Sequence, residues 1–217
     1  MKKTLDVLVV GGGMYVAGKG TQTNGTIMPA LLEGRRNGIV GKLGVVTTSL
    51  ESSRENIERV HQLAGRMGVE SQCEAFPKVG ASHTAYLDAA QKFKPDAVII
   101  SVPDHLHATI SIALIEKGLH CLVVKPMAST LKEAQAMVEA AEREQVVAQV
   151  EFHKRYDESN ILLYDAVQSG KLGDLLYAVI EYSQQKKIPR DIFRSWAEKT
   201  SIFQYLGVHF VDLLFYV

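Results

Sequence analysis

Short apolar runs and amphipathic stretches alternate along the first two thirds of the chain. The apolar runs predict buried strands at residues 7–10, 43–48, 70–76, 96–102, 120–124 and 146–152. Between them, helical spacing and end signals predict helices at residues 26–36, 54–67, 84–93, 108–117 and 131–144. The last of these helices follows a capping box, Thr130-x-x-Glu133. Regular alternation of strand and helix predicts an α/β fold with a doubly wound parallel sheet.

The pattern changes from His153 onward. A helix is expected at residues 159–169, a half-buried strand at 175–182 and a second helix at 203–217. Because the last residues are apolar and carry no cap, we expect a second domain that is cut short. The predicted domains are residues 1–150 and a partial α/β domain over residues 151–217.

The first strand runs directly into three consecutive glycines. Gly11 and Gly13 fill the first two positions of G-x-G-x-x-G, the fingerprint of a dinucleotide-binding βαβ unit, and Val16 takes the third. Glycine permits a sharp turn and a close approach of the backbone to a phosphate. The predicted cofactor-binding residues of this turn are Gly11, Gly13, Met14, Tyr15 and Val16.

Other interpretations of the glycine turn stay open. Gly13-x-x-x-x-Gly18-Lys19 resembles the phosphate-binding loop of nucleoside triphosphatases, although Gly20 stands where Ser or Thr should hold magnesium. A glycine-rich turn of some other α/β protein is a further alternative. In each case we expect a polar loop, residues 19–26, between the glycines and the first helix.

The segment after the second predicted strand bears on the choice of cofactor. Many NAD-binding proteins have an acidic residue there that binds the ribose 2′-hydroxyl. Thr48, Ser49 and Arg54 would better suit a 2′-phosphate, and they favour NADP over NAD. Glu51 keeps NAD open, and Ser52 is an alternative cap for the following helix.

Composition excludes several classes of partner. The chain has 24 basic and 24 acidic residues, so no net charge attracts nucleic acid or an anionic membrane. Lys2 and Lys3 precede an apolar run that is too short for a signal peptide, and no segment is long enough to cross a membrane. Cys73 and Cys121 lack the spacing of a metal site. We expect a cytoplasmic protein with no metal, no nucleic acid and no membrane partner.

Several motifs resemble the glucose–fructose oxidoreductase / inositol dehydrogenase (Gfo/Idh/MocA) family in their order and spacing. They are VPDHLH at 102–107, GLH at 118–120 ahead of Lys125-Pro126, SGKLG at 169–173 and GVHFVD at 207–212. The resemblance extends from Leu5 to the last residue but covers only the first part of the family's second domain. It implies a Rossmann domain and hydride transfer between NAD(P) and a hydroxyl-bearing carbon of a sugar, a polyol or a related small molecule. It also implies a homo-oligomer formed through the second domain.

The resemblance also implies the catalytic residues. Hydride transfer from an alcohol needs a base and a positive group beside the oxygen. Lys125 matches the family's signature lysine, and His209 matches the histidine that usually transfers the proton. Where the family commonly has Glu and Asp, this chain has Val124 and Tyr205. Tyr205 lies four residues before His209, so we predict it as a third catalytic residue on the same helical face.

These two departures also favour an alternative function, a nucleotide-binding sensor or regulatory protein that has kept the fold and lost catalysis. The cofactor would still be bound in that case. Beside the glycine turn, the resemblance implies that it is flanked by Pro103, His105, His107, Lys125 and Pro126. His105 and His107 lack further clustered ligands, so their pairing does not predict a metal site.

Overall fold

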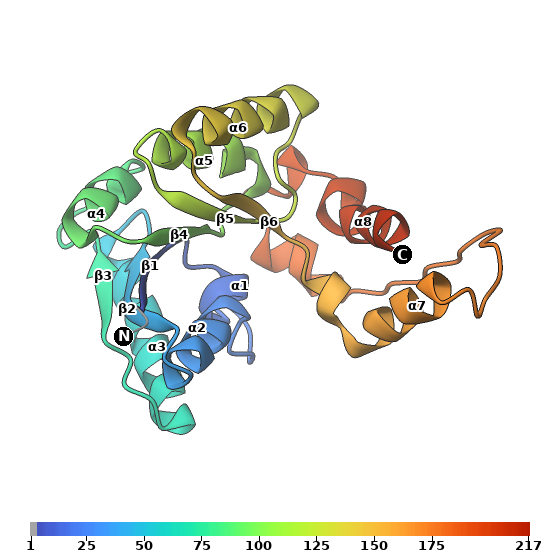
Figure 1. The fold of residues 1–217 in the computed structure, drawn as a ribbon. Helices are drawn as coiled ribbons and strands as arrows, with labels where there is room; N and C mark the ends of the chain where they lie inside the picture. Colours follow the sequence, from blue (N-terminus) through green and yellow to red (C-terminus); the bar gives the residue numbers. More distant parts are fainter. Residues whose placement is uncertain (1–3) are drawn as a thin grey trace.

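The computed structural model describes residues 4–217, so Lys2 and Lys3 lie outside the described residues. A sheet with the strand order β3-β2-β1-β4-β5-β6 forms the centre of the first part of the molecule (Figure 1). Its strands are β1 (Leu5–Val10), β2 (Val40–Val46), β3 (Cys73–Phe76), β4 (Ala97–Ile100), β5 (His120–Val124) and β6 (Ala148–Glu151). Each neighbouring pair of these strands is parallel, which confirms the predicted doubly wound α/β fold.

Helices cover both faces of this sheet (Figure 1). On one face lie α1 (Met14–Ala17), α2 (Ile27–Arg36) and α3 (Leu50–Met67). On the other lie α4 (Ala85–Phe93), α5 (His107–Ile115) and α6 (Leu131–Glu144). Because the chain reverses its direction of winding between β1 and β4, a crevice opens at the carboxyl ends of these strands.

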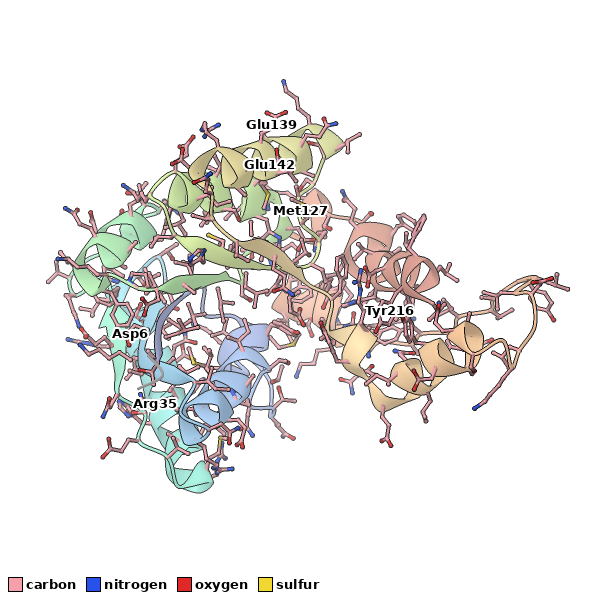
Figure 2. All side chains as sticks on the ribbon, in the orientation of Figure 1. Asp6, Arg35, Met127, Glu139, Glu142 and Tyr216 are labelled. Atoms are coloured by element: carbon pink, nitrogen blue, oxygen red, sulfur yellow. The ribbon has the colours of Figure 1, made fainter. Side chains whose placement is uncertain are left out.

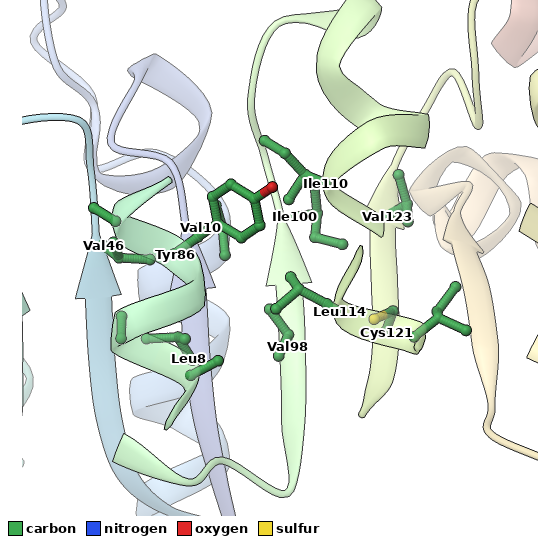
Figure 3. Close-up of a cluster of buried hydrophobic side chains, with 14 of the residues drawn as sticks. Leu8, Val10, Val46, Tyr86, Val98, Ile100, Ile110, Leu114, Cys121 and Val123 are labelled. Carbon is green, nitrogen blue, oxygen red and sulfur yellow. The ribbon is translucent and has the colours of Figure 1, made fainter. Parts of the chain in front are cut away.

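The buried side chains form two apolar clusters, one on each face of the sheet. Figure 3 shows the first cluster, where Leu8, Val98 and Ile100 of the strands pack against Tyr86 of α4 and Leu114 of α5. The largest fully buried members of the second cluster are Met28, Leu32 and Leu43. Burial on both faces explains why the strands read as nearly continuous apolar runs.

Two local predictions near the glycine turn are wrong. The short helix α1 begins directly after Gly13, so the polar loop follows a helix instead of preceding the first one. Helix α3 begins at Leu50, earlier than expected, because Ser49 and not Ser52 is its cap. The backbone of Ser49 is extended, and its hydroxyl accepts a hydrogen bond from the Ser52 N–H at 3.2 Å. The predicted capping box of Thr130 and Glu133 is confirmed at α6.

After β6 the chain forms a second group of elements, whose helices are α7 (Glu158–Gln168) and α8 (Val208–Tyr216) (Figure 1). The rings of Tyr164 and Tyr216 stack between α7 and α8, with centroids 4.7 Å apart; Figure 2 labels Tyr216. Arg155 donates to both carboxylate oxygens of Asp212, at 2.8 and 2.5 Å. Arg155 therefore fixes α8 against the turn that follows β6.

The predicted strand at residues 175–182 is wrong. This segment has no regular secondary structure, and its apolar side chains, among them Leu176 and Tyr177, are largely exposed. A strand is stabilised by hydrogen bonds to a neighbouring strand, and none lies beside this segment within residues 4–217. The expected homo-oligomer through this part of the chain and the division into two domains stay predictions. None of the helices described for residues 4–217 has the length and apolarity needed to cross a membrane.

Candidate active site

A cavity of about 890 Å³ lies at the carboxyl ends of the strands, between the sheet and the elements that follow β6. Its size is in the range of sites for small molecules and cofactors. Of the residues predicted from the sequence, those in its wall are Gly11, Gly13, Met14, Tyr15, Thr48, Pro103, His107, Lys125, Tyr205 and His209. The predicted residues outside its wall are Val16, Ser49, Arg54, His105 and Pro126.

The glycine turn forms one wall of the cavity, and its glycines have different tasks. Gly11 has a φ of +121°, and a Cβ there would overlap the carbonyl oxygen of Ser101. Gly13 has ordinary extended backbone, and a Cβ there would meet nothing within 4 Å. Gly11 therefore allows the turn to pack against the end of β4, whereas Gly13 leaves the backbone open towards the cavity. An open backbone of this kind fits the pyrophosphate of a dinucleotide.

The segment after β2 contributes hydroxyl groups to the cavity. Thr48 and Ser52 line it, whereas Arg54 lies on a separate shallow groove beside Glu51. Lys19 forms an ion pair with Glu55 at 2.7 Å and donates to the Ser52 hydroxyl at 3.3 Å. Since Lys19 does not line the cavity, the structure gives no support to the alternative phosphate-binding loop.

Lys125 follows β5 directly and is buried, with 7% of its surface exposed. Its Nζ donates to the carbonyl oxygen of Tyr205 at 2.5 Å and lies 4.1 Å from the centroid of the Tyr205 ring. Burial lowers the pKa of Lys125 to about 8, although the negative charges of Asp104 and Glu151 oppose this shift. The cavity therefore contains a cation that can exchange its proton near neutral pH.

His209 lies on α8 and is also buried, with 5% of its surface exposed. Burial lowers its pKa to about 3, and the positive charge of Lys125 and the neighbouring His153 contribute to this shift. The rings of His153 and His209 make an edge-on contact with centroids 4.8 Å apart. The Nδ1 atom of His209 is buried without a hydrogen-bond partner. His209 thus contributes a neutral imidazole to the cavity wall, and its Nδ1 is covered by protein atoms.

The burial of neutral His209 predicts a pH-dependent stability. The unfolded chain binds a proton at this side chain below about pH 6.5, whereas the folded chain does so only near pH 3. Stability is therefore lost as the pH falls through this window, by about 1.5 kcal/mol from this residue between pH 6.5 and pH 5. Urea unfolding of the wild type and of His209→Phe at both pH values measures the difference. The exposed His61 gives the matched control, His61→Gln; equal pH dependence in all three proteins contradicts the prediction.

Tyr205 lines the cavity from the π-helical turn Phe203–Gly207, which continues into α8. Its carbonyl oxygen holds Lys125, and its hydroxyl accepts a hydrogen bond from Gln184 at 3.5 Å. Burial raises the pKa of the Tyr205 hydroxyl, so the group keeps its proton at neutral pH. Tyr205 can donate a hydrogen bond but cannot replace a carboxylate.

His107 joins two of the loops that form the cavity. Its buried ring lies between two backbone carbonyls, with Nδ1 2.6 Å from the oxygen of Pro126 and Nε2 2.9 Å from that of Val102. It therefore fixes the backbone next to Lys125. His105 lies on the adjacent turn, with Nε2 3.5 Å from the Nζ of Lys199. The described residues include no group of three or more His, Cys, Asp or Glu side chains arranged to hold a metal.

Three residues near the catalytic candidates have no role in the sequence-based predictions. Asp104 lines the cavity at the end of β4, and its carboxylate accepts a hydrogen bond from Thr200 at 2.7 Å. Glu151 ends β6, and His153 lines the cavity two residues later. Asp104 could have been suspected because it follows a buried strand at the carboxyl edge of the sheet. Glu151, the last residue of β6, and His153, two residues later, lie at the same edge of the sheet and could have been suspected for the same reason.

Comparison with known proteins agrees with this architecture. A family model described as "Oxidoreductase family, NAD-binding Rossmann fold" (GFO_IDH_MocA) matches residues 5–152. Scyllo-inositol 2-dehydrogenase (NADP(+)) of Bacillus subtilis is 26% identical over 121 residues, which are 54% of this chain and 33% of that protein. Levoglucosan dehydrogenase of Pseudarthrobacter phenanthrenivorans is 33% identical over 105 residues, which are 48% of this chain and 27% of that protein. The matched regions thus span a third or less of these relatives.

Solved structures show the same fold over nearly the whole chain. The crystal structure of myo-inositol 2-dehydrogenase from Lactobacillus plantarum superposes with a TM-score of 0.70 at 18% identity. The match covers 98% of this chain and 56% of that one. The residues that the family model matches include the whole sheet, its flanking helices and the part of the cavity wall that these elements form. The chain therefore belongs to the Gfo/Idh/MocA oxidoreductase family, as its motifs predict.

Proposed function

We propose that the protein is an NAD(P)-dependent oxidoreductase that transfers a hydride between nicotinamide and a hydroxyl-bearing carbon of a sugar or polyol. One observation carries this proposal: Lys125 and His209, from distant parts of the chain, line the same cavity as the glycine turn. The relatives named above act, by their names, on scyllo-inositol and levoglucosan. Both compounds carry secondary hydroxyl groups, the functional group that this chemistry requires.

The cavity supplies distinct groups for this reaction. When bound, the nicotinamide would supply the hydride acceptor. The residues of the chain stabilise the charge on the substrate oxygen and transfer its proton. The ammonium of Lys125 stabilises the negative charge that develops on the substrate oxygen. Burial keeps His209 neutral, so it adds no second positive charge beside Lys125 in the cavity wall. Tyr205 keeps its proton and can donate to the same oxygen.

The lining near β2 favours NADP as the cofactor. Thr48 and Ser52 place hydroxyl groups in the cavity wall there. In the part of the chain that the structure describes, Asp104 is the carboxylate in the wall, and it lies at the end of β4. A 2′-phosphate would therefore meet hydrogen-bond donors without a repelling carboxylate. Glu51 lies outside the cavity and is not placed to bind a ribose 2′-hydroxyl.

Fluorescence titration with NADPH and NADH tests the cofactor proposal. We expect NADPH to bind about tenfold more tightly, which corresponds to about 1.4 kcal/mol. Thr48→Val should reduce this ratio, and Thr109→Val, a matched substitution elsewhere in the wall, should leave it unchanged. Equal or tighter binding of NADH would contradict the preference. Failure to bind either cofactor would contradict the proposed function.

Turnover is tested with NADP⁺ or NAD⁺ and a panel of scyllo-inositol, myo-inositol, levoglucosan and glucose 6-phosphate. The appearance of the reduced cofactor at 340 nm reports hydride transfer. The alternative is a cofactor-binding sensor, and the apolar Val124 next to Lys125 is the observation that favours it. Tight binding of the cofactor without turnover of any member of the panel would support the sensor instead.

A further inference from the structure

A carboxylate lies next to Lys125, on the neighbouring strand. In the register of β5 and β6, Glu151 is the direct partner of Val124. Val124 is apolar and buried, so β5 itself contributes no charge at this level of the sheet. The negative charge of Glu151 nevertheless reaches Lys125, where it opposes the effect of burial on the lysine pKa. A carboxylate of the adjacent strand, outside the cavity wall, thus acts on the lysine of the cavity.

Glu151 forms a compact group with two side chains of the cavity wall, Tyr15 and His153. The Nδ1 atom of His153 lies 2.8 Å from Oε1 of Glu151. The Tyr15 hydroxyl lies 3.2 Å from both carboxylate oxygens and 3.1 Å from the same Nδ1. Burial and the charge of Glu151 raise the pKa of Tyr15, so its hydroxyl keeps its proton and donates. Tyr15 comes from α1, so the group joins the glycine turn to the end of β6.

These contacts fix where His153 carries its proton. A carboxylate is a stronger acceptor than a phenol oxygen, so a hydrogen on Nδ1 points to Glu151 while the tyrosine donates to the same carboxylate. The hydrogen is therefore on Nδ1 and the lone pair on Nε2. Nε2 is on the side of the ring away from Glu151, and the structure describes no hydrogen-bond partner for it. Because His153 lines the cavity and its Nδ1 is held by Glu151, Nε2 is the ring nitrogen left for a bound hydroxyl.

We propose that His153, held by Glu151 and Tyr15, is the residue that accepts the proton of the substrate hydroxyl. The inference rests on the proposed function. In the oxidation direction the O–H bond breaks and its proton passes to Nε2 of His153. The C–H bond breaks as its electron pair leaves with the hydrogen, as hydride, to oxidised NAD(P). The electron pair of the former O–H bond completes the C=O bond of the product.

The surroundings of the two histidines favour His153 over His209 for this role. Glu151 stabilises a positive charge on the His153 ring, whereas the charge of Lys125 acts against one on His209. The other groups near His153 are His209, which is neutral, and Lys154, whose charge is paired with Asp157 at 2.9 Å. His153 is therefore the imidazole that can hold a proton without leaving a charge unpaired. Glu151 and Tyr15 act through it as positioning residues.

Nitrogen-15 NMR of the imidazoles tests the tautomer without any need for turnover. His153→Gln removes one imidazole from the spectrum and thereby assigns it. We expect that signal to show hydrogen on Nδ1 in the wild type. In Glu151→Gln we expect a mixture of tautomers, because a neutral amide oxygen accepts the hydrogen bond of Nδ1 more weakly than a carboxylate. Identical spectra in the wild type and Glu151→Gln would overturn the proposal.

Kinetics then test the chemical role with whichever polyol of the panel is turned over. We expect His153→Gln to lower kcat/KM about 100-fold. Glu151→Gln should lower it about 10-fold, because the imidazole would no longer be held in the tautomer that accepts the proton. His61 and Glu74 are exposed residues away from the cavity, and His61→Gln and Glu74→Gln are the matched controls. Their kcat/KM should stay within twofold of the wild-type value. The stability of each variant is followed by urea unfolding, so that loss of fold is not mistaken for loss of function.

The outcomes separate this inference from the function on which it rests. Wild-type kinetics in His153→Gln, with turnover intact, would overturn the role of His153 and leave the oxidoreductase in place. An unchanged kcat/KM in Glu151→Gln would overturn the role of Glu151. Absence of turnover in the wild type, with the tautomer still dependent on Glu151, would remove the proposed function and the proton transfer with it.

Discussion

Lys125→Met is expected to lower kcat about 10³-fold and to leave the affinity for NADPH within about threefold of the wild type. The expectation follows from the ammonium group, which is placed by the Tyr205 carbonyl and lies in the same cavity as His209. Removal of a fixed charge that stabilises a developing oxyanion commonly costs two to three orders of magnitude in rate. Methionine keeps the length and the packing of the side chain, so the loss should fall on the chemistry. Stopped-flow measurement of NADPH formation gives kcat.

Lys125→Met is expected to lower the activity but to maintain or raise the stability at neutral pH. The folded chain holds Lys125 at a pKa of about 8, below the ordinary 10.5, so its charge is unfavourable to folding below about pH 8. Stability should rise with pH between 8 and 10.5 in the wild type and show no such rise from this residue in Lys125→Met. At pH 7 the variant should unfold at an equal or higher urea concentration. Turnover at the wild-type rate in Lys125→Met would contradict the catalytic role of Lys125. The matched control is Lys92→Met, on the exposed face of α4.

Gly13→Leu is expected to weaken the binding of NADPH at least 100-fold while the melting temperature changes by no more than about 2 °C. The backbone of Gly13 is extended, a conformation that leucine adopts without strain. A Cβ at this position meets no protein atom within 4 Å, and Gly13 lines the cavity, so we expect the leucine side chain to occupy space proposed for the dinucleotide. Fluorescence titration measures the affinity and differential scanning fluorimetry the melting temperature.

Gly11→Ala is the matched contrast two residues earlier. Its φ of +121° is strained for alanine, and the methyl group overlaps the backbone of Ser101. We expect a loss of about 3 kcal/mol or more in the free energy of unfolding. Strong binding of NADPH by Gly13→Leu would show that the dinucleotide does not pass over the glycine turn. Equal stability of Gly11→Ala and the wild type would contradict the packing described at the end of β4.

The sheet could be predicted from the sequence because its strands are buried on both faces and carry their own apolar signal. Residues 120–124 form β5 with the predicted bounds, and apart from the short helix α1 the order of α-helices and strands up to β6 is as expected. Residues 175–182 have an equally clear alternation but no neighbouring strand to pair with. Periodicity reports which face of a segment is apolar. It does not report whether another strand lies beside it.

Site residues that belong to a sequence motif could be predicted. Site residues whose role depends on the contact between two strands could not. Lys125 and His209 belong to motifs that match the family, and they line one cavity as the proposed chemistry requires. The relation between Val124 and Glu151 depends on the register of two strands separated by a whole helix. His153 becomes a candidate only through its contacts with Glu151 and with Tyr15, and Tyr15 is remote in sequence. The separation of Arg54 from the cavity likewise depends on how α3 is oriented against the sheet.

The hydrogen bond between Lys125 and residue 205 goes to the backbone oxygen, not to the side chain. Every amino acid offers that same acceptor. This hydrogen bond therefore does not depend on the identity of residue 205, whereas the contact of the ammonium with the Tyr205 ring does. A different side chain at position 205 would reshape the cavity wall around the ammonium without removing its backbone acceptor.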